Sequence, residues 1–205
     1  MTTNPNTQYS SAEIELLVLQ AQTGDSESLQ KLYYCFAKAL ERYALLQSSD
    51  AELARDACQE CWLNCCRKLT QLKDPAAFRA WLFSSLRHRI VDLARNKDAF
   101  RRRLERLEQE NEIYRCSEEA YEPSLEQEGS LTESTSLPLW SAIRNLPQQE
   151  RQCIYLFYQE EFSTREIALT LGVSQGTIKS QLSRGRQHLR DALNKASTNV
   201  KPNNN

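Results

Sequence analysis

The stretch from residue 163 to residue 193 constrains the fold most, because it carries two helical apolar patterns that are separated by one glycine. Ser163 and Glu166 have the spacing of a capping box, which favours a short helix that begins at this point. Gly172 suits the left-handed residue that ends such a helix, and Ser174 can cap the next one. The apolar residues of that second helix fall on one side: Ile178, Leu182, Leu189 and Leu193. Two short helices joined by a tight glycine turn are typical of a helix-turn-helix.

The opposite side of this second helix has the composition of a surface that enters a DNA groove. With Ile178 at the buried centre and about 100° per residue, that side carries small and basic residues: Gly176, Lys179, Ser180, Ser183 and Arg184. Gln175 and Thr177 lie near the helix start, where the base contacts of this motif usually occur. A basic helix face is often only a solvated surface, but the capped glycine turn beside it favours DNA binding.

The remainder of the chain is predicted to be helical as well. The 205 residues include only five glycines and six prolines, which is too little turn chemistry for an all-β sandwich. Apolar residues recur at helical spacing through residues 12–103 and again through residues 138–196. The expected fold class is therefore all-α, with an N-terminal helical bundle, a C-terminal helix-turn-helix domain and a disordered tail over residues 197–205.

Charge divides the chain into the same two domains and a linker. Residues 79–103 hold eight Arg or Lys against two Asp, and residues 172–195 hold five basic residues against one Asp. Residues 104–136, by contrast, hold ten Glu against two Arg. We therefore expect an acidic, flexible linker over residues 104–137, although its first part, up to Tyr114, can extend the preceding helix.

A helix predicted from Asp50 to Leu69 carries two distinct stripes. Cys58, Cys61 and Cys65 lie on its apolar side at helical spacing. A straight helix sets such thiolates in a row, which suits tetrahedral zinc poorly, so we interpret them as small core residues. The opposite side of the helix is polar: Asp56, Gln59, Glu60, Asn64 and Arg67.

The sequence contains no motif of an enzyme or of a cofactor site. It has no Walker loop, no HExxH and no nucleophile elbow, so we expect no catalytic activity, no cofactor and no metal. Seven cysteines in a chain without an export signal indicate reduced thiols in the cytoplasm. No apolar run approaches the roughly 18 residues of a membrane span, so membrane insertion is not expected. Trp62 and Trp81 lie on apolar stripes and are interpreted as core residues.

Two blocks of the sequence resemble the conserved domains of bacterial sigma factors. The block 139–195 resembles their C-terminal domain through Leu146–Pro147, Ser163–Ala168 and Gly172–Ser180. The block 13–103 resembles their other domain through Gly24–Asp25, Asp56–Glu60, Phe78–Leu82 and Asp92–Arg95. Two such domains joined by a short linker resemble the extracytoplasmic-function (ECF) group of the sigma-70 family. The resemblance covers about three quarters of the chain.

This resemblance implies a non-enzymatic subunit that joins core RNA polymerase and directs it to promoters. In the family, the polar stripe that contains Gln59 and Glu60 binds the clamp coiled coil of the polymerase β′ subunit. The C-terminal domain binds the −35 element and the β flap, and the linker runs towards the RNA exit channel, where negative charge can mimic RNA. Relatives are often held inactive by an anti-sigma factor, which makes such a protein a candidate partner.

The resemblance also implies which residues contact promoter DNA. In the family, one strand of the −10 element is captured unpaired, and a flipped base is held by the loop that here spans residues 72–77. The implied −10 contacts are Asp74, Ala76, Arg79, Arg87, His88, Asp92 and Arg95. Of these, His88 stands where many relatives carry Asn. The implied −35 contacts are Thr164, Arg165, Ser174, Gln175, Gly176, Thr177, Lys179, Ser180, Ser183 and Arg184.

Two other functions are compatible with parts of the sequence. An ordinary helix-turn-helix repressor or activator needs only the C-terminal domain, and neither the Gln59–Glu60 signature nor the Arg79–Trp81 block. A metal or redox sensor rests only on the cysteine stripe. DNA binding without polymerase favours the first alternative, and stoichiometric zinc favours the second.

Overall fold

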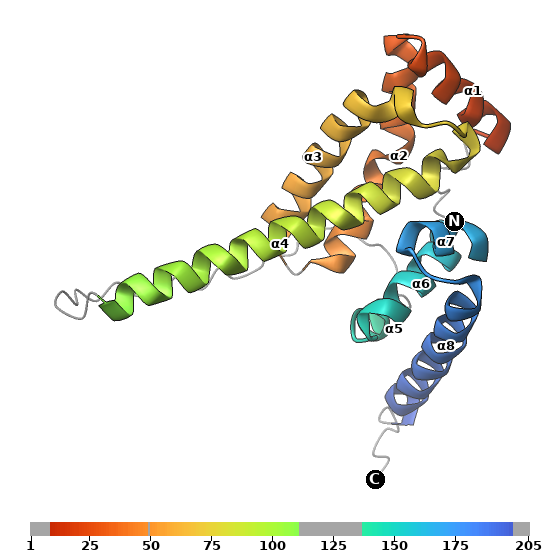
Figure 1. Ribbon diagram of the computed structural model, residues 1–205. Coiled ribbons are helices and arrows are strands. Elements are labelled where there is room, and N and C mark those ends of the chain that lie inside the picture. The colour runs from red at the N-terminus through yellow and green to blue at the C-terminus, as the bar shows by residue number, and fades with distance from the viewer. Residues whose placement is uncertain (1–8, 49, 111–136, 199–205) are drawn as a thin grey trace.

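The computed structural model describes residues 9–48, 50–110 and 137–198, and within these ranges it is helical without strands. The N-terminal domain consists of α1 (Ser11–Gln22), α2 (Ser26–Gln47), α3 (Ala51–Lys68) and α4 (Phe78–Glu110), with the short turns η2 (Leu69–Gln71) and η3 (Pro75–Ala77) between the last two. The C-terminal domain consists of α5 (Leu137–Arg144), α6 (Gln148–Tyr158), α7 (Thr164–Leu171) and α8 (Gln175–Thr198). Figure 1 shows the two groups of helices, so the all-α prediction is confirmed.

Polar caps set where the N-terminal helices begin. Ser10 and Glu13 form a reciprocal capping box at the start of α1. Asp25 accepts hydrogen bonds from two backbone N–H groups at the start of α2, and Asp50 does the same for α3. Lys97 of α4 forms an ion pair with Asp50, which ties the start of α3 to the long helix.

The core of the N-terminal domain forms where one face of each helix meets the others. Fully buried side chains come from every helix: Val18, Leu32, Phe36, Ala57, Cys61, Cys65, Leu82 and Leu86. Phe36 and Phe78 meet edge to face with ring centroids 5.6 Å apart. Burial of this apolar surface drives the packing of the bundle.

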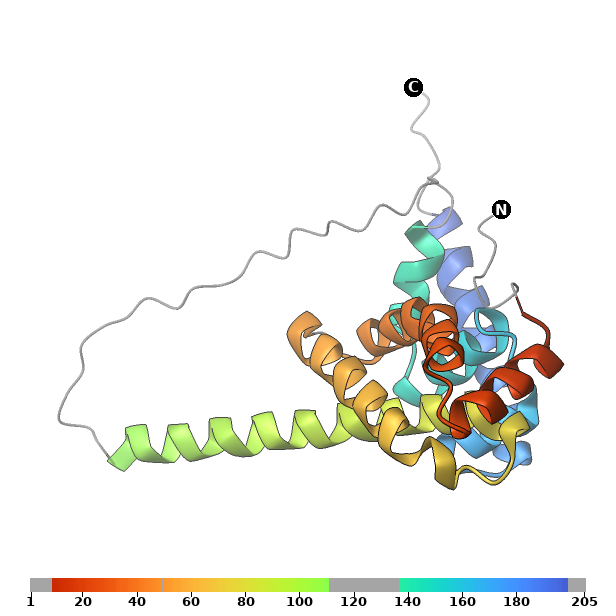
Figure 2. The ribbon, with the colours of Figure 1, turned by 90° about the horizontal axis from the view of Figure 1, so that it is seen from above.

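The helix α4 extends beyond the other helices of the N-terminal domain (Figures 1 and 2). It runs for 33 residues, and its N-terminal half packs on α2 and α3. Its C-terminal half extends away from the other helices in both views, and residues 95–104 are exposed (Figures 1 and 2). The helix therefore continues past residue 103, as expected for the first part of the acidic segment. Residues 111–136 and 199–205 lie outside the described residues. The helix α8 ends at Thr198, so it includes the first two residues of the tail that is expected from residue 197.

The helix-turn-helix forms as predicted from its caps. Ser163 and Glu166 make the reciprocal capping box of α7, and Gly172 adopts φ 69° and ψ 34° in the left-handed region. The second glycine of structural consequence is Gly185, where α6 and α8 cross. A Cβ at this position would lie 2.8 Å from Cγ1 of Ile154, so the close approach of the two helices requires glycine.

The two domains share an aromatic contact. Phe83 of α4 packs edge to face on Phe162, which precedes α7, with ring centroids 5.1 Å apart. Tyr43 of α2 adds to this contact, with its ring centroid 5.4 Å from that of Phe83 in its own domain and 5.8 Å from that of Tyr155 in α6. All four rings are buried, so the helix-turn-helix is seated on the N-terminal bundle through α7.

Candidate nucleic-acid interface

The N-terminal half of α8 is presented to solvent. Ser174 accepts a hydrogen bond from the N–H of Thr177 at 3.1 Å and so caps the helix. Ile178 and Leu182 are buried beneath it. The exposed residues are those that the sequence placed on the outer side and at the helix start: Ser174, Gln175, Gly176, Thr177, Lys179, Ser180, Ser183 and Arg184. The major groove of DNA is wide enough to admit an α-helix, and the basic charge of this face suits the phosphates of the DNA.

The helix α7 packs against α8. Thr164 is half-buried and Arg165 is exposed. The capping box before them holds the turn, because Ser163 Oγ accepts the Glu166 N–H at 3.2 Å and the Glu166 carboxylate accepts the Ser163 N–H at 2.8 Å.

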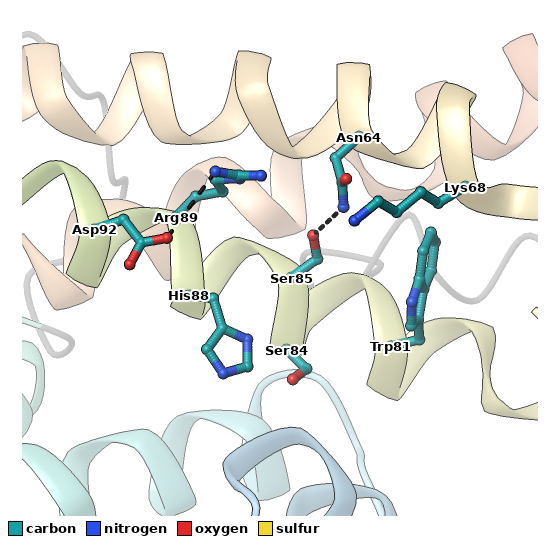
Figure 3. A pocket seen from close by; sticks show the side chains of 8 residues that line it. All are labelled: Asn64, Lys68, Trp81, Ser84, Ser85, His88, Arg89 and Asp92. Atoms are coloured by element: carbon teal, nitrogen blue, oxygen red, sulfur yellow. Dashed lines mark hydrogen bonds and ion pairs between the residues drawn. The ribbon is translucent and has the colours of Figure 1, made fainter.

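A pocket lies between α3 and α4 (Figure 3). It has a volume of about 350 Å³. Its lining residues are Asn64 and Lys68 of α3 together with Trp81, Ser84, Ser85, His88, Arg89 and Asp92 of α4. The indole of Trp81 offers a face on which a flat ring can stack, and the cations beside it suit a phosphate.

Internal contacts hold the walls of this pocket. Asn64 Nδ2 donates to Ser85 Oγ at 3.0 Å, which ties α3 to α4. Arg89 lies 3.8 Å from Glu60 and 4.0 Å from Asp92, measured between nitrogen and oxygen atoms. Of the lining residues, Asn64, His88 and Asp92 were expected at functional sites. Lys68, Ser84, Ser85 and Arg89 were missed, because only the packing of α3 against α4 brings them together.

Trp81 has a role beyond the predicted one. It is half-buried, packs against the core and lies with its ring centroid 6.1 Å from that of Phe78. Its other side lines the pocket, as Figure 3 shows. Trp62 is half-buried as well and meets Tyr33 at a centroid distance of 5.0 Å. The core interpretation therefore holds for both rings, but Trp81 also faces the pocket.

Hydrogen bonds between its own residues stabilise the loop over residues 72–77. Asp74 Oδ1 accepts a hydrogen bond from the Ala76 N–H at 3.0 Å, and the Ala77 N–H donates to the Asp74 carbonyl at 3.0 Å. Asp74 and Ala76 are exposed. The loop leads directly into α4, and the residues that line the pocket come from the two helices on either side of it.

The residues expected at the −10 element fall on two sides of α4. His88, Asp92 and Arg95 are exposed. Arg79 instead faces the other domain, where it donates to the Glu160 carbonyl at 2.6 Å and lies 4.5 Å from the centroid of the Phe162 ring.

Arg87 also faces the helix-turn-helix. It is half-buried and lines a small cavity of about 60 Å³ together with Thr177 and Gln181 of α8. In this arrangement, the residues expected at the −10 element do not form one continuous surface. Arg79 and Arg87 lie against the C-terminal domain, whereas His88, Asp92 and Arg95 lie in the open.

The polar stripe of α3 is also divided. Asp56, Gln59 and Arg67 are exposed. Glu60 and Asn64 turn towards α4, where they contact Arg89 and Ser85. A partner protein can therefore reach the three exposed residues directly. The Glu60 side chain also stays 45% exposed beside Arg89, and Asn64 lines the pocket.

Three cysteines of α3 lie in the core or pack against it, Cys58, Cys61 and Cys65, whereas Cys66 is exposed. Cys61 and Cys65 are buried, and burial raises the pKa of the Cys61 thiol to about 11 and that of Cys65 to about 12. Burial also raises the pKa of Cys58 to about 12. Thiols with such pKa values stay protonated near neutral pH and are poor nucleophiles and metal ligands. Among the described residues, no group of three or more His, Cys, Asp or Glu is placed to hold a metal ion.

Comparison with known proteins identifies both domains. Residues 32–100 match the model of sigma-70 region 2, and residues 136–189 match that of sigma-70, region 4. The chain belongs to the sigma-70 family. Its two expected sigma domains are thus confirmed, in the expected order. Sigma factors are non-catalytic subunits of RNA polymerase.

The relatives place this sigma factor in the ECF group. It is 29% identical over 174 residues to the ECF RNA polymerase sigma factor SigL of Mycobacterium tuberculosis. The aligned residues cover 84% of this chain and 93% of the relative. It is 31% identical over 181 residues to the ECF RNA polymerase sigma factor SigE of Mycolicibacterium smegmatis. The aligned residues cover 86% of this chain and 66% of the relative. The ECF resemblance is confirmed, and the protein is an alternative sigma factor that directs transcription initiation.

Solved structures of sigma factors have the same fold. CnrH, solved in complex with the cytosolic domain of CnrY, matches with a TM-score of 0.61 and 22% identity over 89% of this chain and 97% of that one. RpoE of Bartonella quintana, solved with the anti-sigma factor NepR, matches with a TM-score of 0.58 and 26% identity over 80% of this chain and 96% of that one. Within the described residues, no helix of this sigma factor is long and apolar enough to cross a membrane.

Proposed function

We propose that this sigma factor reads the −35 element with α8 and captures an unpaired −10 base in the pocket between α3 and α4. The exposed N-terminal half of α8 carries the proposal. Small side chains there allow close approach to the groove, and Lys179 and Arg184 can reach phosphates or guanine edges. We propose that Thr164 and Arg165, in the first turn of α7, add contacts to the backbone of the same DNA segment.

The α3–α4 pocket supports the −10 part of the proposal. A base that leaves the duplex needs an aromatic face for stacking and cations for its phosphates. Trp81 supplies the first, and Lys68 at the opposite wall supplies a cation. His88 lines the same pocket and offers a ring nitrogen to the edge of the base, so we propose that it helps to decide which base is accepted.

Use of the whole −10 surface requires the two domains to separate. Arg79 and Arg87 face the helix-turn-helix in the present arrangement. We propose that they turn to the DNA backbone, with Asp74, Ala76, Asp92 and Arg95 beside them, once the domains move apart. The acidic segment 104–137 joins the domains and is long enough in sequence to allow this.

A partner surface on α3 completes the proposal. We propose that Asp56, Gln59 and Arg67 contact the β′ clamp coiled coil of core RNA polymerase, because they are exposed on one helix and carry charge for electrostatic docking. The C-terminal domain is proposed to contact the β flap. CnrH and RpoE were solved with the cytosolic domain of CnrY and with the anti-sigma factor NepR, respectively, which supports an anti-sigma factor as a further partner. The protein would act in the cytoplasm, where core polymerase and promoters meet, and would catalyse no reaction itself.

Substitutions on α8 test this function. Lys179→Ala and Arg184→Ala are each expected to weaken binding of the holoenzyme to the −35 element by about 1–3 kcal/mol if they contact bases. If they contact phosphates instead, the salt dependence of binding becomes shallower. Lys195→Ala is the control, because this cation is exposed near the other end of the same helix.

The promoter comes from selection of randomised duplex DNA by the holoenzyme, and affinity is then measured by titration of the selected duplex. Unchanged affinity in both α8 variants, with native helicity, would show that α8 is not the reader. A chain that binds the selected DNA equally well without core polymerase and does not support run-off transcription would instead be an ordinary helix-turn-helix regulator.

A further inference from the structure

The side chain of Gln22 connects the end of α1 to the turn that follows α3. Its Nε2 atom donates to the Leu69 carbonyl at 2.8 Å and to the Leu72 carbonyl at 2.7 Å. A primary amide has two N–H donors, so both are used in these two bonds. The side chain is half-buried, and the two bonds join parts of the chain that are 47 and 50 residues apart.

The carbonyls that Gln22 binds belong to a stretch of backbone that lacks a regular helical ladder. The last carbonyls of a helix have no intrahelical partner, and α3 ends at this point. The Leu72 N–H closes the short turn by donating to the Leu69 carbonyl at 3.1 Å. Gln22 therefore acts as a cap that is supplied by another helix, and it fixes where the chain leaves α3.

This stretch of backbone positions two parts of the proposed −10 site. Lys68, which lines the pocket, directly precedes Leu69. The loop over residues 72–77 directly follows the turn and leads into α4 and Trp81. The far end of that loop is held by the local cap at Asp74. The near end is held by Gln22, from outside the segment.

We propose that Gln22 is a positioning residue for capture of the unpaired promoter base, because its two hydrogen bonds set where Lys68 and the 72–77 loop stand relative to Trp81. The inference rests on the proposed function of the pocket and adds a residue outside it. Gln22 itself does not line the pocket. Binding sites require their walls to be held to within about 0.5 Å, so loss of this cap changes the pocket even when the fold is intact.

Two substitutions at residue 22 test the role. Gln22→Glu keeps the shape but replaces the amide donor with an oxygen that repels both carbonyls. Gln22→Met keeps much of the volume and removes the donor without adding charge. Gln30→Met and Gln30→Glu are the matched controls, because Gln30 is exposed on α2. All variants are studied as the full chain bound to core polymerase.

The measurement separates the two promoter elements. The probes are duplex DNA that carries the selected −35 element, and four single strands of the selected −10 element that differ only at the most discriminating base. Gln22→Glu is expected to weaken binding of the preferred strand roughly tenfold and to reduce the preference among the four bases. Affinity for the −35 duplex and for core polymerase is expected to stay at the wild-type value, as is every property of the Gln30 variants.

Each outcome decides the inference. A selective loss of −10 affinity and base preference supports the positioning role. Equal losses on both elements, or wild-type base preference in a folded Gln22→Glu protein, would overturn it. If Gln22→Glu does not fold, the same criteria are applied to Gln22→Met. If the wild-type holoenzyme itself shows no base preference on the −10 strands, the proposed function of the pocket fails, which is a different result from a wild-type preference that Gln22→Glu retains.

Discussion

At the residue scale, Glu160 is fully buried, which is rare for an acidic side chain. Its carboxylate is buried at the contact between the domains, where Oε1 accepts a hydrogen bond from the Tyr155 hydroxyl at 3.0 Å. Arg42 of α2 lies 3.7 Å from the same oxygen. Burial raises the pKa of this carboxyl, and the hydrogen bond from Tyr155 and the charges of Arg42 and Arg79 oppose the rise only in part.

This raised pKa predicts a pH dependence of stability. The folded state binds the proton more tightly than the unfolded state, so the carboxyl favours folding at low pH. That contribution is lost as the pH rises through the raised folded pKa. Glu160→Gln keeps the shape and an oxygen that can accept from Tyr155, but it removes the charge. We therefore expect a flatter stability profile for Glu160→Gln than for the wild type.

Thermal unfolding between about pH 4 and pH 8 checks this expectation. Glu161→Gln is the matched control, because the neighbouring residue is exposed. The stability curves of the wild type and Glu160→Gln should differ most at the upper end of the pH range, where the buried carboxylate of the wild type is ionised. Parallel curves for the wild type and Glu160→Gln would contradict the assignment of a raised pKa.

At the element scale, the crossing of α6 and α8 depends on one glycine. Gly185→Ala places a methyl group 2.8 Å from Ile154 Cγ1 and 3.5 Å from Glu150 Cβ. The helices must shift to relieve this overlap, so we expect a loss of about 1–3 kcal/mol in the free energy of unfolding. Urea unfolding monitored by circular dichroism measures the loss.

Gly176 in the same helix provides the control. A Cβ there would meet Ser174 Oγ at 3.6 Å, an ordinary contact distance, and the position is exposed. Alanine also favours helix over glycine by about 0.5–1 kcal/mol. Gly176→Ala is therefore expected to leave stability unchanged or to raise it. Equal losses in the two variants would argue against a close crossing at Gly185.

At the scale of the whole molecule, the contact between the domains covers part of α4. Arg79 donates to the Glu160 carbonyl and lies over the Phe162 ring, while Thr170 Oγ1 of α7 donates to the Glu166 carbonyl at 2.9 Å and lies 3.4 Å from the Ala80 carbonyl. Removal of the Arg79 side chain takes away a charge-assisted hydrogen bond and a cation–π contact without opening the core of either domain.

We therefore expect Arg79→Ala to populate a more open arrangement of the free protein. Small-angle X-ray scattering should report a larger radius of gyration than for the wild type. Arg95→Ala, on an exposed part of the same helix, should leave it unchanged. A radius of gyration in Arg79→Ala equal to that of the wild type would mean that the other contacts between the domains keep them together without Arg79.

Local sequence patterns are sufficient to predict the helices and both sigma domains. The capping box at Ser163, the left-handed Gly172 and the stripe that buries Ile178 depend on residues a few positions apart, and such local effects act in the same way in any fold. Motifs such as Asp56–Glu60 are likewise recognised from consecutive residues of the sequence. For this reason the fold class, the outer face of α8 and the buried cysteines Cys61 and Cys65 could all be predicted.

Only the tertiary structure decided how the candidate site is assembled. The pocket needs α3 against α4, the cap from Gln22 joins residues about 50 positions apart, and Arg79 faces Phe162 because α7 packs on α4. Helical periodicity indicates which residues share one face of a helix. The helix against which that face packs is decided by long-range packing, in which several polar faces compete for few neighbours. The polar stripe of α3 includes Glu60 by spacing alone, for example, and only the folded protein shows Arg89 at 3.8 Å from its carboxylate.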